Sequence, residues 1–294
     1  MHTAITGRNL PRGVVSALGA AILFSTGGAA IKMAAFSGLQ VASLRSVVAA
    51  LVLLVWARGH IVWSGPIFAV GVVYAATLTL FVTSTKLTTA ANAIFLQSTA
   101  PLYIVVLGPL LLGERFRVRD LPFMAALGVG LGLCFLGRPD ATATAPDPQT
   151  GNLLGILGGI AWALTLMGLR WAERRESHIG ISALIAGNTI AFLIGIPFLL
   201  PLPTASIGEW TTLVYLGAIQ IALAYVLLTR AVADLPAFDV SLLLLLEPVL
   251  NPLWAWLFRG ETPGRWTLAG GTIILAATAI RTMTTGGSNA GSIE

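Results

Sequence analysis

One carboxylate lies in the middle of an apolar run that is long enough to cross a membrane. The stretch from Pro236 to Glu261 has the sequence PAFDVSLLLLLEPVLNPLWAWLFRGE, with Glu247 near its centre and Pro248 beside it. A charged side chain at the centre of a spanning helix costs about 3 kcal/mol even on lenient insertion scales, so Glu247 should face protein or water. There it can couple transport to protons or contact the ammonium group of a solute. Proline disfavours helical geometry at the residue before it, which loosens the helix at this level.

Glu247 also has a structural interpretation, in which it pairs with Lys32, Arg45 or another base and holds the helices together. Arg45 lies inside the second apolar run, near its outer end. For Arg45 we favour a structural pair, or a side chain that extends along its own stem to the membrane interface. The sequence leaves both interpretations of Glu247 open.

Polar side chains also follow one face of the fourth apolar run. Asn92, Thr99 and Tyr103 share this face, which is the counterpart of the Glu247 face on the ninth run. Two helices that are not neighbours in sequence and carry equivalent polar faces indicate a shared central cavity. Hydrogen bonds between helices are the competing explanation for Asn92 and Tyr103.

Aromatic residues recur on the runs that would surround such a cavity. Phe24 and Trp162 occupy equivalent positions on the first and sixth runs, while Tyr74, Phe81 and Tyr225 lie on the third and eighth. A cavity with aromatic walls and a few amides and hydroxyls suits small amphipathic solutes. Aromatic residues in spans also serve in packing or lie at the membrane interface, so this assignment is an expectation.

Catalytic and metal-binding arrangements are missing from the sequence. The histidines, His2, His60 and His178, all fall in tails or loops, so no histidine dyad or metal site can form inside the membrane. No HExxH motif or phosphate-binding loop is present, which argues against direct ATP drive. We therefore expect no enzyme, no catalytic residue, no metal and no cofactor.

The composition predicts an all-α membrane protein. Of 294 residues, 56% are hydrophobic and only 10% are charged, with a mean hydropathy of +0.87, whereas soluble domains usually carry about 25% charge. The net charge of +5 reflects arginines that orient the chain in the membrane, and we expect no nucleic-acid partner. We predict ten transmembrane helices at roughly 13–34, 39–57, 66–84, 88–112, 118–137, 151–172, 179–200, 209–230, 236–258 and 264–283.

The two halves of the chain resemble each other. Pro101 and the pair Gly113-Glu114 match Pro248 and the pair Gly260-Glu261 at a shift of 147 residues. We predict a first five-helix repeat at 13–137, a linker at 138–150, a second five-helix repeat at 151–283 and a flexible tail at 284–294. Because each repeat has an odd number of spans, the second copy is inverted relative to the first. Pro101 and Pro248 are the paired helix interruptions and our candidate hinges.

The placement of basic residues predicts the orientation of the chain. With the N-terminus inside, most arginines fall in cytoplasmic segments, among them Arg12, Arg58, Arg174 and Arg230. Positive residues accumulate on the cytoplasmic side of membrane proteins. We expect a multi-pass protein of the cell inner (plasma) membrane, surrounded by lipid, with both termini in the cytoplasm.

Two segments of the sequence resemble a known family. The segments PLYIVVLGPLLLGERF at 101–116 and LLEPVLNPLWAWLFRGE at 245–261 resemble the drug/metabolite transporter superfamily, and specifically its EamA-type members. The resemblance covers nearly the whole chain, from about Gly13 to Arg281. It implies export of amino acids or related small solutes, and some members pump aromatic compounds.

We therefore expect a secondary transporter that exports small organic solutes, most of all amino acids, by alternating access through a central cavity. Other cargoes stay open, namely a nucleotide sugar, a lipid-linked sugar or a cationic drug. A passive pore and an intramembrane enzyme are the alternatives from other classes. A chain with its own internal two-fold symmetry can work as a monomer.

Overall fold

The computed structural model describes residues 10–111, 121–136, 142–175 and 179–290. These ranges are helical apart from turns, short loops and one isolated bridge between Thr142 and Ala145, so the all-α prediction is confirmed for them. The helices are α1 (Leu10–Ser25), α2 (Gly27–Met33), α3 (Gly38–Ala57), α4 (Gly65–Leu87), α5 (Ala90–Gln97), α6 (Ala100–Leu111), α7 (Leu121–Leu136), α8 (Pro148–Arg175), α9 (Ile179–Gly195), α10 (Ile207–Tyr215), α11 (Ala224–Asp234), α12 (Ala237–Leu243), α13 (Leu246–Arg259) and α14 (Arg265–Ala290). A π-helical segment, Leu216–Leu223, joins α10 to α11, and a short 3₁₀ turn, Ile196–Phe198, follows α9.

Eight helical runs in the described part of the chain are long and apolar enough to cross a membrane. They are Leu10–Met33, Gly38–Ala57, Gly65–Leu87, Ala90–Gly108, Pro148–Arg175, Ile179–Phe198, Ile207–Asp234 and Asp239–Phe258. Each coincides with one predicted span to within a few residues. The two remaining predicted spans, 118–137 and 264–283, fall on α7 and α14, which are helical but do not meet the same criterion over their described residues.

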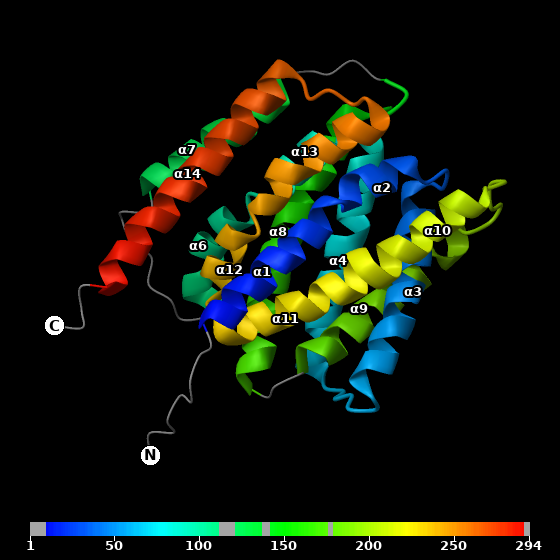
Figure 1. Ribbon diagram of the computed structural model, residues 1–294, viewed down its shortest axis with the longest axis horizontal. Coiled ribbons are helices and arrows are strands. Elements are labelled where there is room, and N and C mark those ends of the chain that lie inside the picture. Colours follow the sequence, from blue (N-terminus) through cyan, green and yellow to red (C-terminus); the bar gives the residue numbers. More distant parts are fainter. Residues whose placement is uncertain (1–9, 112–120, 137–141, 176–178, 291–294) are drawn as a thin grey trace.

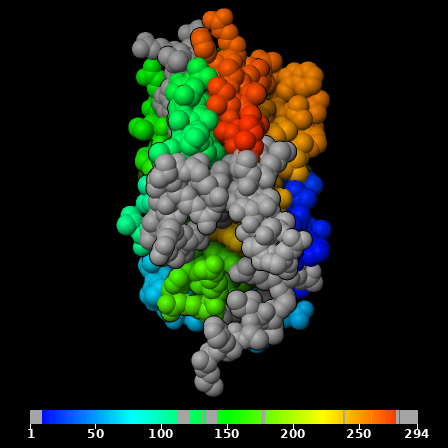
Figure 2. Space-filling view, turned by 90° about the vertical axis from the view of Figure 1, so that its left-hand side faces the viewer, coloured from blue at the N-terminus to red at the C-terminus, as the bar shows by residue number. Residues whose placement is uncertain are grey.

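The long helix α8 lies inside the bundle and touches α4, α5, α6 and α11 (Figure 1). Helices α3 and α4 pack in turn on α9, and α1 packs on α11. Helices α7 and α14 pack along each other, and Figure 2 shows them side by side in green and red. Helix α1 begins and α14 ends toward the same end of the bundle.

Local hydrogen bonds explain where two of these helices begin. The Ser37 hydroxyl accepts from the backbone N–H of Gln40, and the Gln40 side chain accepts from the N–H of Ser37, which forms a capping box at α3. Ser206 and Glu209 form the same reciprocal pair at α10. Helix α3 stops at Arg58, whose φ of 49° is left-handed and cannot continue a helix.

The start of α8 lies inside the predicted linker 138–150. The Asp147 carboxylate accepts from the backbone N–H of Thr150 at 3.2 Å, and Pro148 takes the first helical position, where its missing N–H is not needed. Hydrogen bonds from the Thr150 side chain and backbone hold the pKa of Asp147 below its ordinary value. The last residues of the linker are therefore already helical.

The predicted flexible tail, 284–294, also differs from the structure. Helix α14 continues to Ala290, and residues 291–294 lie outside the described ranges. Extending an existing helix adds one hydrogen bond per residue without a new nucleus, so a glycine-containing stretch can follow on from an apolar helix.

Three of the eight spanning runs are interrupted in the middle. Thr26 separates α1 from α2, residues 98–99 separate α5 from α6, and residues 244–245 separate α12 from α13. Pro101 and Pro248 lie just after the second and third interruptions. Pro248 has no N–H to donate to the carbonyl of Leu244, which accepts instead from the N–H of Glu247 at 2.9 Å. A fourth span contains the wider turns of the segment Leu216–Leu223.

Glycines permit close approach at these interruptions. A Cβ added to Gly27 would lie 2.7 Å from Nε2 of Gln220, and one added to Gly28 would overlap Oδ1 of Asn251. A Cβ on Gly159 would lie 2.9 Å from the backbone oxygen of Leu96. Small residues at helix interfaces are the usual means of close packing in membrane proteins.

Candidate functional site

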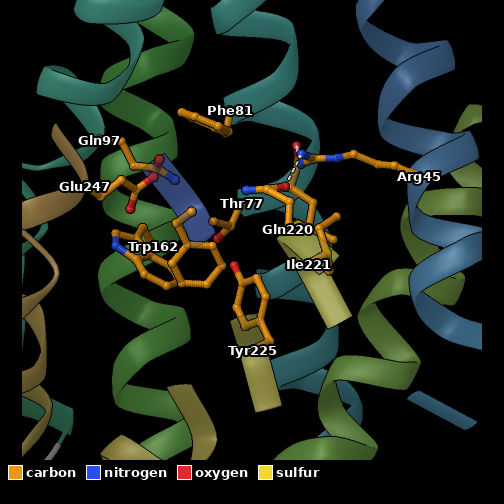
Figure 3. A pocket seen from close by; sticks show the side chains of 11 residues that line it. Arg45, Thr77, Phe81, Gln97, Trp162, Gln220, Ile221, Tyr225 and Glu247 are labelled. Carbon is orange, nitrogen blue, oxygen red and sulfur yellow. Dashed lines mark hydrogen bonds between the residues drawn. The ribbon is translucent and has the colours of Figure 1, made fainter. Parts of the chain in front are cut away.

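A small cavity lies where the interrupted helices meet, and we call it the central cavity (Figure 3). Its volume is about 30 Å³, which holds about two water molecules and no organic solute. It is lined by Phe24, Arg45, Thr77, Leu78, Phe81, Gln97, Trp162, Gln220, Ile221, Tyr225 and Glu247. An adjoining space of about 10 Å³ shares Gln97, Trp162 and Glu247 with it.

Some of the lining residues lie at or next to irregular points of the helices. Phe24 lies two residues before the interruption at Thr26, and Gln97 is the last residue of α5. Gln220 belongs to the π-helical segment, and Glu247 is the second residue of α13. Interrupted helices and π-helical turns are frequent at functional sites, because they place backbone and side-chain polar groups where a regular helix cannot.

Aromatic rings close one side of the central cavity. The ring centroids of Phe24 and Tyr225 are 4.9 Å apart, and those of Trp162 and Tyr225 are 6.0 Å apart. Tyr74 packs against Tyr225 from behind, with centroids 4.7 Å apart, and Phe24 meets Trp162 at 6.2 Å. All four pairs are edge-to-face, which is a favourable arrangement worth about 0.5–1.5 kcal/mol per pair beyond area burial.

Two ionisable side chains of opposite charge reach the central cavity. Arg45 is 1% exposed and Glu247 is 8% exposed. Arg45 donates to Oε1 of Gln220 and to the backbone oxygen of Leu78, both at 3.3 Å. Figure 3 shows Arg45 and Gln220 on one side of the cavity and Glu247 with Gln97 on the other.

The predicted structural pair between Glu247 and Lys32 or Arg45 is not formed. Lys32 instead forms an ion pair with Glu261, with Nζ 3.7 Å from Oε2. Arg45 is bound by an amide and a carbonyl instead, as described above. Within the described ranges, Glu247 therefore lacks the basic partner that its structural interpretation requires in this conformation.

The structure brings together five of the residues predicted for the cavity, namely Phe24, Phe81, Trp162, Tyr225 and Glu247. Tyr74 lies one layer further out and does not line the cavity. Its hydroxyl accepts from Nδ2 of Asn188 at 3.2 Å, while its ring supports Tyr225. Pro101 lines the adjoining smaller space.

The other predicted cavity residues lie elsewhere. The Thr99 hydroxyl donates to the backbone oxygen of Leu96 at 2.6 Å, within the α5–α6 interruption. Tyr103 is half-buried on α6 and packs against the hydrophobic core. Asn92 joins helices: its Nδ2 donates to Oδ1 of Asn152 at 3.0 Å, and its Oδ1 accepts from the Thr267 hydroxyl at 2.5 Å.

Asn92 belongs to a buried polar network that we call the Lys32 cluster (Lys32, Thr88, Asn92, Asn152 and Glu261). Lys32 donates to the backbone oxygen of Thr88 at 2.7 Å, and the Thr88 hydroxyl donates to Oδ1 of Asn152 at 2.8 Å. Glu261 accepts from the backbone N–H of Ala90 at 2.5 Å. This cluster ties α2, α5, α8 and the α13–α14 connection together at one end of the bundle.

Sequence reasoning missed four polar lining residues. Thr77, Gln97 and Gln220 were not proposed, and Arg45 was assigned to a structural pair or to the membrane interface. Gln97 and Gln220 each sit in an apolar run, so the argument applied to Glu247, that a polar group inside a span should face protein, would have found them.

The described residues contain no group of three or more His, Cys, Asp or Glu side chains that could hold a metal ion. The central cavity offers one basic and one acidic side chain, two amides and the hydroxyls of Thr77 and Tyr225, beside aromatic rings. Such a set can bind a small polar or amphipathic molecule once the cavity widens.

Comparison with known proteins adds a family assignment. The model of the EamA-like transporter family matches residues 11–138 and 149–283. An uncharacterized transporter of Archaeoglobus fulgidus is 29% identical over 205 residues, covering 69% of this chain and 71% of that protein. The pseudopaline exporter CntI of Pseudomonas aeruginosa is 28% identical over 192 residues, and the match spans 64% of each protein.

A solved crystal structure shares the fold. It aligns with a TM-score of 0.66 over 92% of this chain and 96% of its own, at 21% sequence identity. At that identity the likeness concerns the fold alone.

Proposed function

This chain belongs to the EamA-like transporter family, and from that premise we propose that it is a secondary transporter which exports small organic solutes, foremost amino acids, through the central cavity. The observation that carries the proposal is the cavity itself. Buried Arg45, Glu247, Gln97 and Gln220 converge there with aromatic rings, although each polar group would be costly in a site that served packing alone. One relative is named as an exporter, which supports the direction of transport.

The full architecture in this proposal is ten transmembrane helices in two inverted five-helix repeats. Helices α7 and α14 supply the fifth and tenth spans beside the eight that meet the length and hydropathy criterion. The two segments matched by the family model, 11–138 and 149–283, support a division near the predicted linker. The paired interruptions before Pro101 and Pro248 support an equivalence between the fourth and ninth spans.

The mechanism in this proposal is alternating access. A cavity of about 30 Å³ cannot hold an amino acid, so the aromatic rings must separate before a solute enters. The first helices of each repeat, α1–α2 and α8, would rock against the remaining helices and expose the cavity to one side at a time. The interruptions before Pro101 and Pro248 would absorb the change in direction as hinges, because a helix that lacks hydrogen bonds at one level bends there most easily.

The orientation in this proposal places both termini in the cytoplasm, with the chain in the inner membrane. The start of α1 and the end of α14 lie toward the same end of the bundle, which supports termini on one side. The Lys32 cluster then lies at the outer end. A cysteine introduced at Thr204 should react with an impermeant reagent from outside intact cells, whereas one at Arg174 should be protected.

Uptake into energised vesicles distinguishes this function from a passive pore. Inside-out vesicles that contain the protein should accumulate a labelled amino acid above the external concentration, and an uncoupler should abolish the accumulation. Equilibration without accumulation, unaffected by the uncoupler, would indicate a pore and contradict a coupled carrier.

A further inference from the structure

Arg45 is a buried cation at the edge of the central cavity for which the described part of the chain provides no countercharge. Its bonds to Gln220 and to the backbone oxygen of Leu78 use two of the five N–H groups of a guanidinium, and both acceptors are neutral. Its Nε has no hydrogen-bond partner. A buried cation that binds neutral acceptors alone is incompletely compensated, so an anion that entered the cavity would be strongly favoured there.

Glu247, across the cavity from Arg45, is a buried acid without a basic partner among the residues that the structure describes. It lines both the central cavity and the adjoining space, and within the described ranges no base lies within ion-pair distance of it. Gln97 lies beside it, while Gln220 lies beside Arg45 (Figure 3). Each end of the cavity therefore carries one ionisable side chain and one amide, with Trp162 beside Glu247 and Tyr225 nearer the middle (Figure 3).

We propose that the central cavity is a two-ended site for a dipolar ion, with Arg45 as the anchor of the solute's carboxylate and Glu247 as the anchor of its ammonium group. This inference rests on the proposed function and specifies how the same cavity selects its solute. A guanidinium binds a carboxylate with two parallel hydrogen bonds, which gives both strength and direction. Gln220 uses its oxygen for Arg45, so its Nε2 is the group that can donate to the same carboxylate.

The two charges together exclude solutes that carry one charge. A simple amine would satisfy Glu247 and leave Arg45 uncompensated, and a simple carboxylic acid would do the reverse. Within the ranges that the structure describes, both side chains already lack a countercharge before a solute enters. A solute with one charged group therefore gains one charge-assisted contact where a dipolar ion gains two, and it binds more weakly for that reason. The solute is therefore expected to need both groups.

The test compares one amino acid with two analogues that each lack a charge: phenylalanine, phenethylamine and 3-phenylpropionate. Each analogue competes with labelled phenylalanine for exchange into proteoliposomes that contain the whole chain. Wild-type protein should favour phenylalanine over either analogue by at least tenfold. Arg45→Gln should raise the KM for phenylalanine at least tenfold and abolish its advantage over phenethylamine, and Arg45→Lys should recover part of the loss. Glu247→Gln should abolish the advantage over 3-phenylpropionate instead.

Arg174→Gln is the matched control, because Arg174 is an exposed arginine in the last turn of α8. It should leave KM and the order of preference unchanged. If Arg45→Gln lowers the maximal rate for all solutes but keeps the wild-type preference, Arg45 is structural and the inference is overturned.

A wild-type protein that exchanges no amino acid would refute the proposed substrate class, which is a separate result. The two-ended site is then tested by the melting temperature of the purified protein, measured with and without each of the same three compounds. A rise with phenylalanine alone, lost in Arg45→Gln, would support the two-ended site, and no rise with any of them would overturn it.

Discussion

At the scale of single residues, the central cavity holds charge where the membrane makes charge costly. Glu247 and Arg45 are both buried, and neither is neutralised by an ion pair within the described ranges. Buried ionisable side chains without an ion pair reduce stability, so we expect them at positions where they serve binding or coupling. Glu247 is the acid that we expect to couple transport to protons.

Glu247→Gln tests this coupling role. The amide keeps the size and much of the polarity of the carboxylate but cannot release a proton. Exchange should therefore slow by about 100-fold, as for the loss of a proton-transfer group, and become insensitive to pH. Initial rates between pH 5.5 and 8.5 are the measurement. A variant whose rate and pH profile match those of the wild type would eliminate Glu247 from coupling.

Sequence alone singles out Glu247, because the cost of a buried charge does not depend on tertiary detail. The same argument holds for Gln97 and Gln220, which are polar groups inside apolar runs and line the cavity as Glu247 does. Asn92 and Thr99 could not be separated from cavity residues by sequence, because a polar face on a helix serves equally for a cavity or for a neighbouring helix. Helix rotation decides between the two, and it is set by packing.

At the scale of elements, the interruptions of the spanning helices determine where the cavity lies. Phe24, Gln97 and Glu247 lie within two residues of an interruption, and Gln220 lies in the π-helical segment. The interruptions before Pro101 and Pro248 could be predicted, because proline disfavours helical geometry at the residue before it. The interruption at Thr26 and the π-helical segment carry no proline, so no comparable local signal marked them.

Gly27→Ala tests how tightly the α1–α2 interruption is coupled to the cavity. The added Cβ would lie 2.7 Å from Nε2 of Gln220, so the end of that side chain must move and its bond to Arg45 must change. We expect a KM raised about fivefold or more with little loss of stability, since the displaced atom ends a flexible side chain.

Gly158→Ala is the matched control for this substitution. A Cβ there would meet Leu80 at an ordinary 3.7 Å, and alanine stabilises a helix relative to glycine by about 1 kcal/mol. We expect unchanged transport and an equal or higher melting temperature. Equal KM values for both glycine variants would contradict the proposed coupling between Gly27 and Gln220.

Pro248→Ala tests the hinge. Alanine restores an N–H that can bond to the carbonyl of Leu244, which should continue the helix through the interruption. We expect a higher melting temperature together with a maximal transport rate reduced severalfold. A variant that transports at the wild-type rate would show that the interruption is not a hinge.

At the scale of the whole molecule, the Lys32 cluster joins segments that are far apart in the chain. Lys32 and Glu261 have side chains 3% and 4% exposed, and the pair links α2 to the connection between α13 and α14. The sequence positions of the eight runs that meet the spanning criterion could be predicted from hydropathy. The link between Lys32 and Glu261 could not, because it depends on how helices far apart in the chain pack against each other.

A double-mutant cycle measures the strength of this link. Lys32→Met and Glu261→Gln should each destabilise the protein by about 3–5 kcal/mol, because each leaves a buried charge without its partner. The double variant should lose less than the sum, by at least about 1 kcal/mol. Additive losses in thermal or denaturant unfolding would mean that the pair contributes no coupling between these segments.

The central claim is that the cavity carries amino acids as a transporter does, and counterflow in proteoliposomes tests it most directly. Vesicles are preloaded with one unlabelled amino acid at a time and then given a trace of labelled amino acid outside. We predict that preloading drives a transient accumulation of label for several amino acids, and that Trp162→Ala weakens it by enlarging the binding site. No accumulation with any amino acid would contradict the proposed substrate class and direct the search to sugars, nucleotides and organic cations.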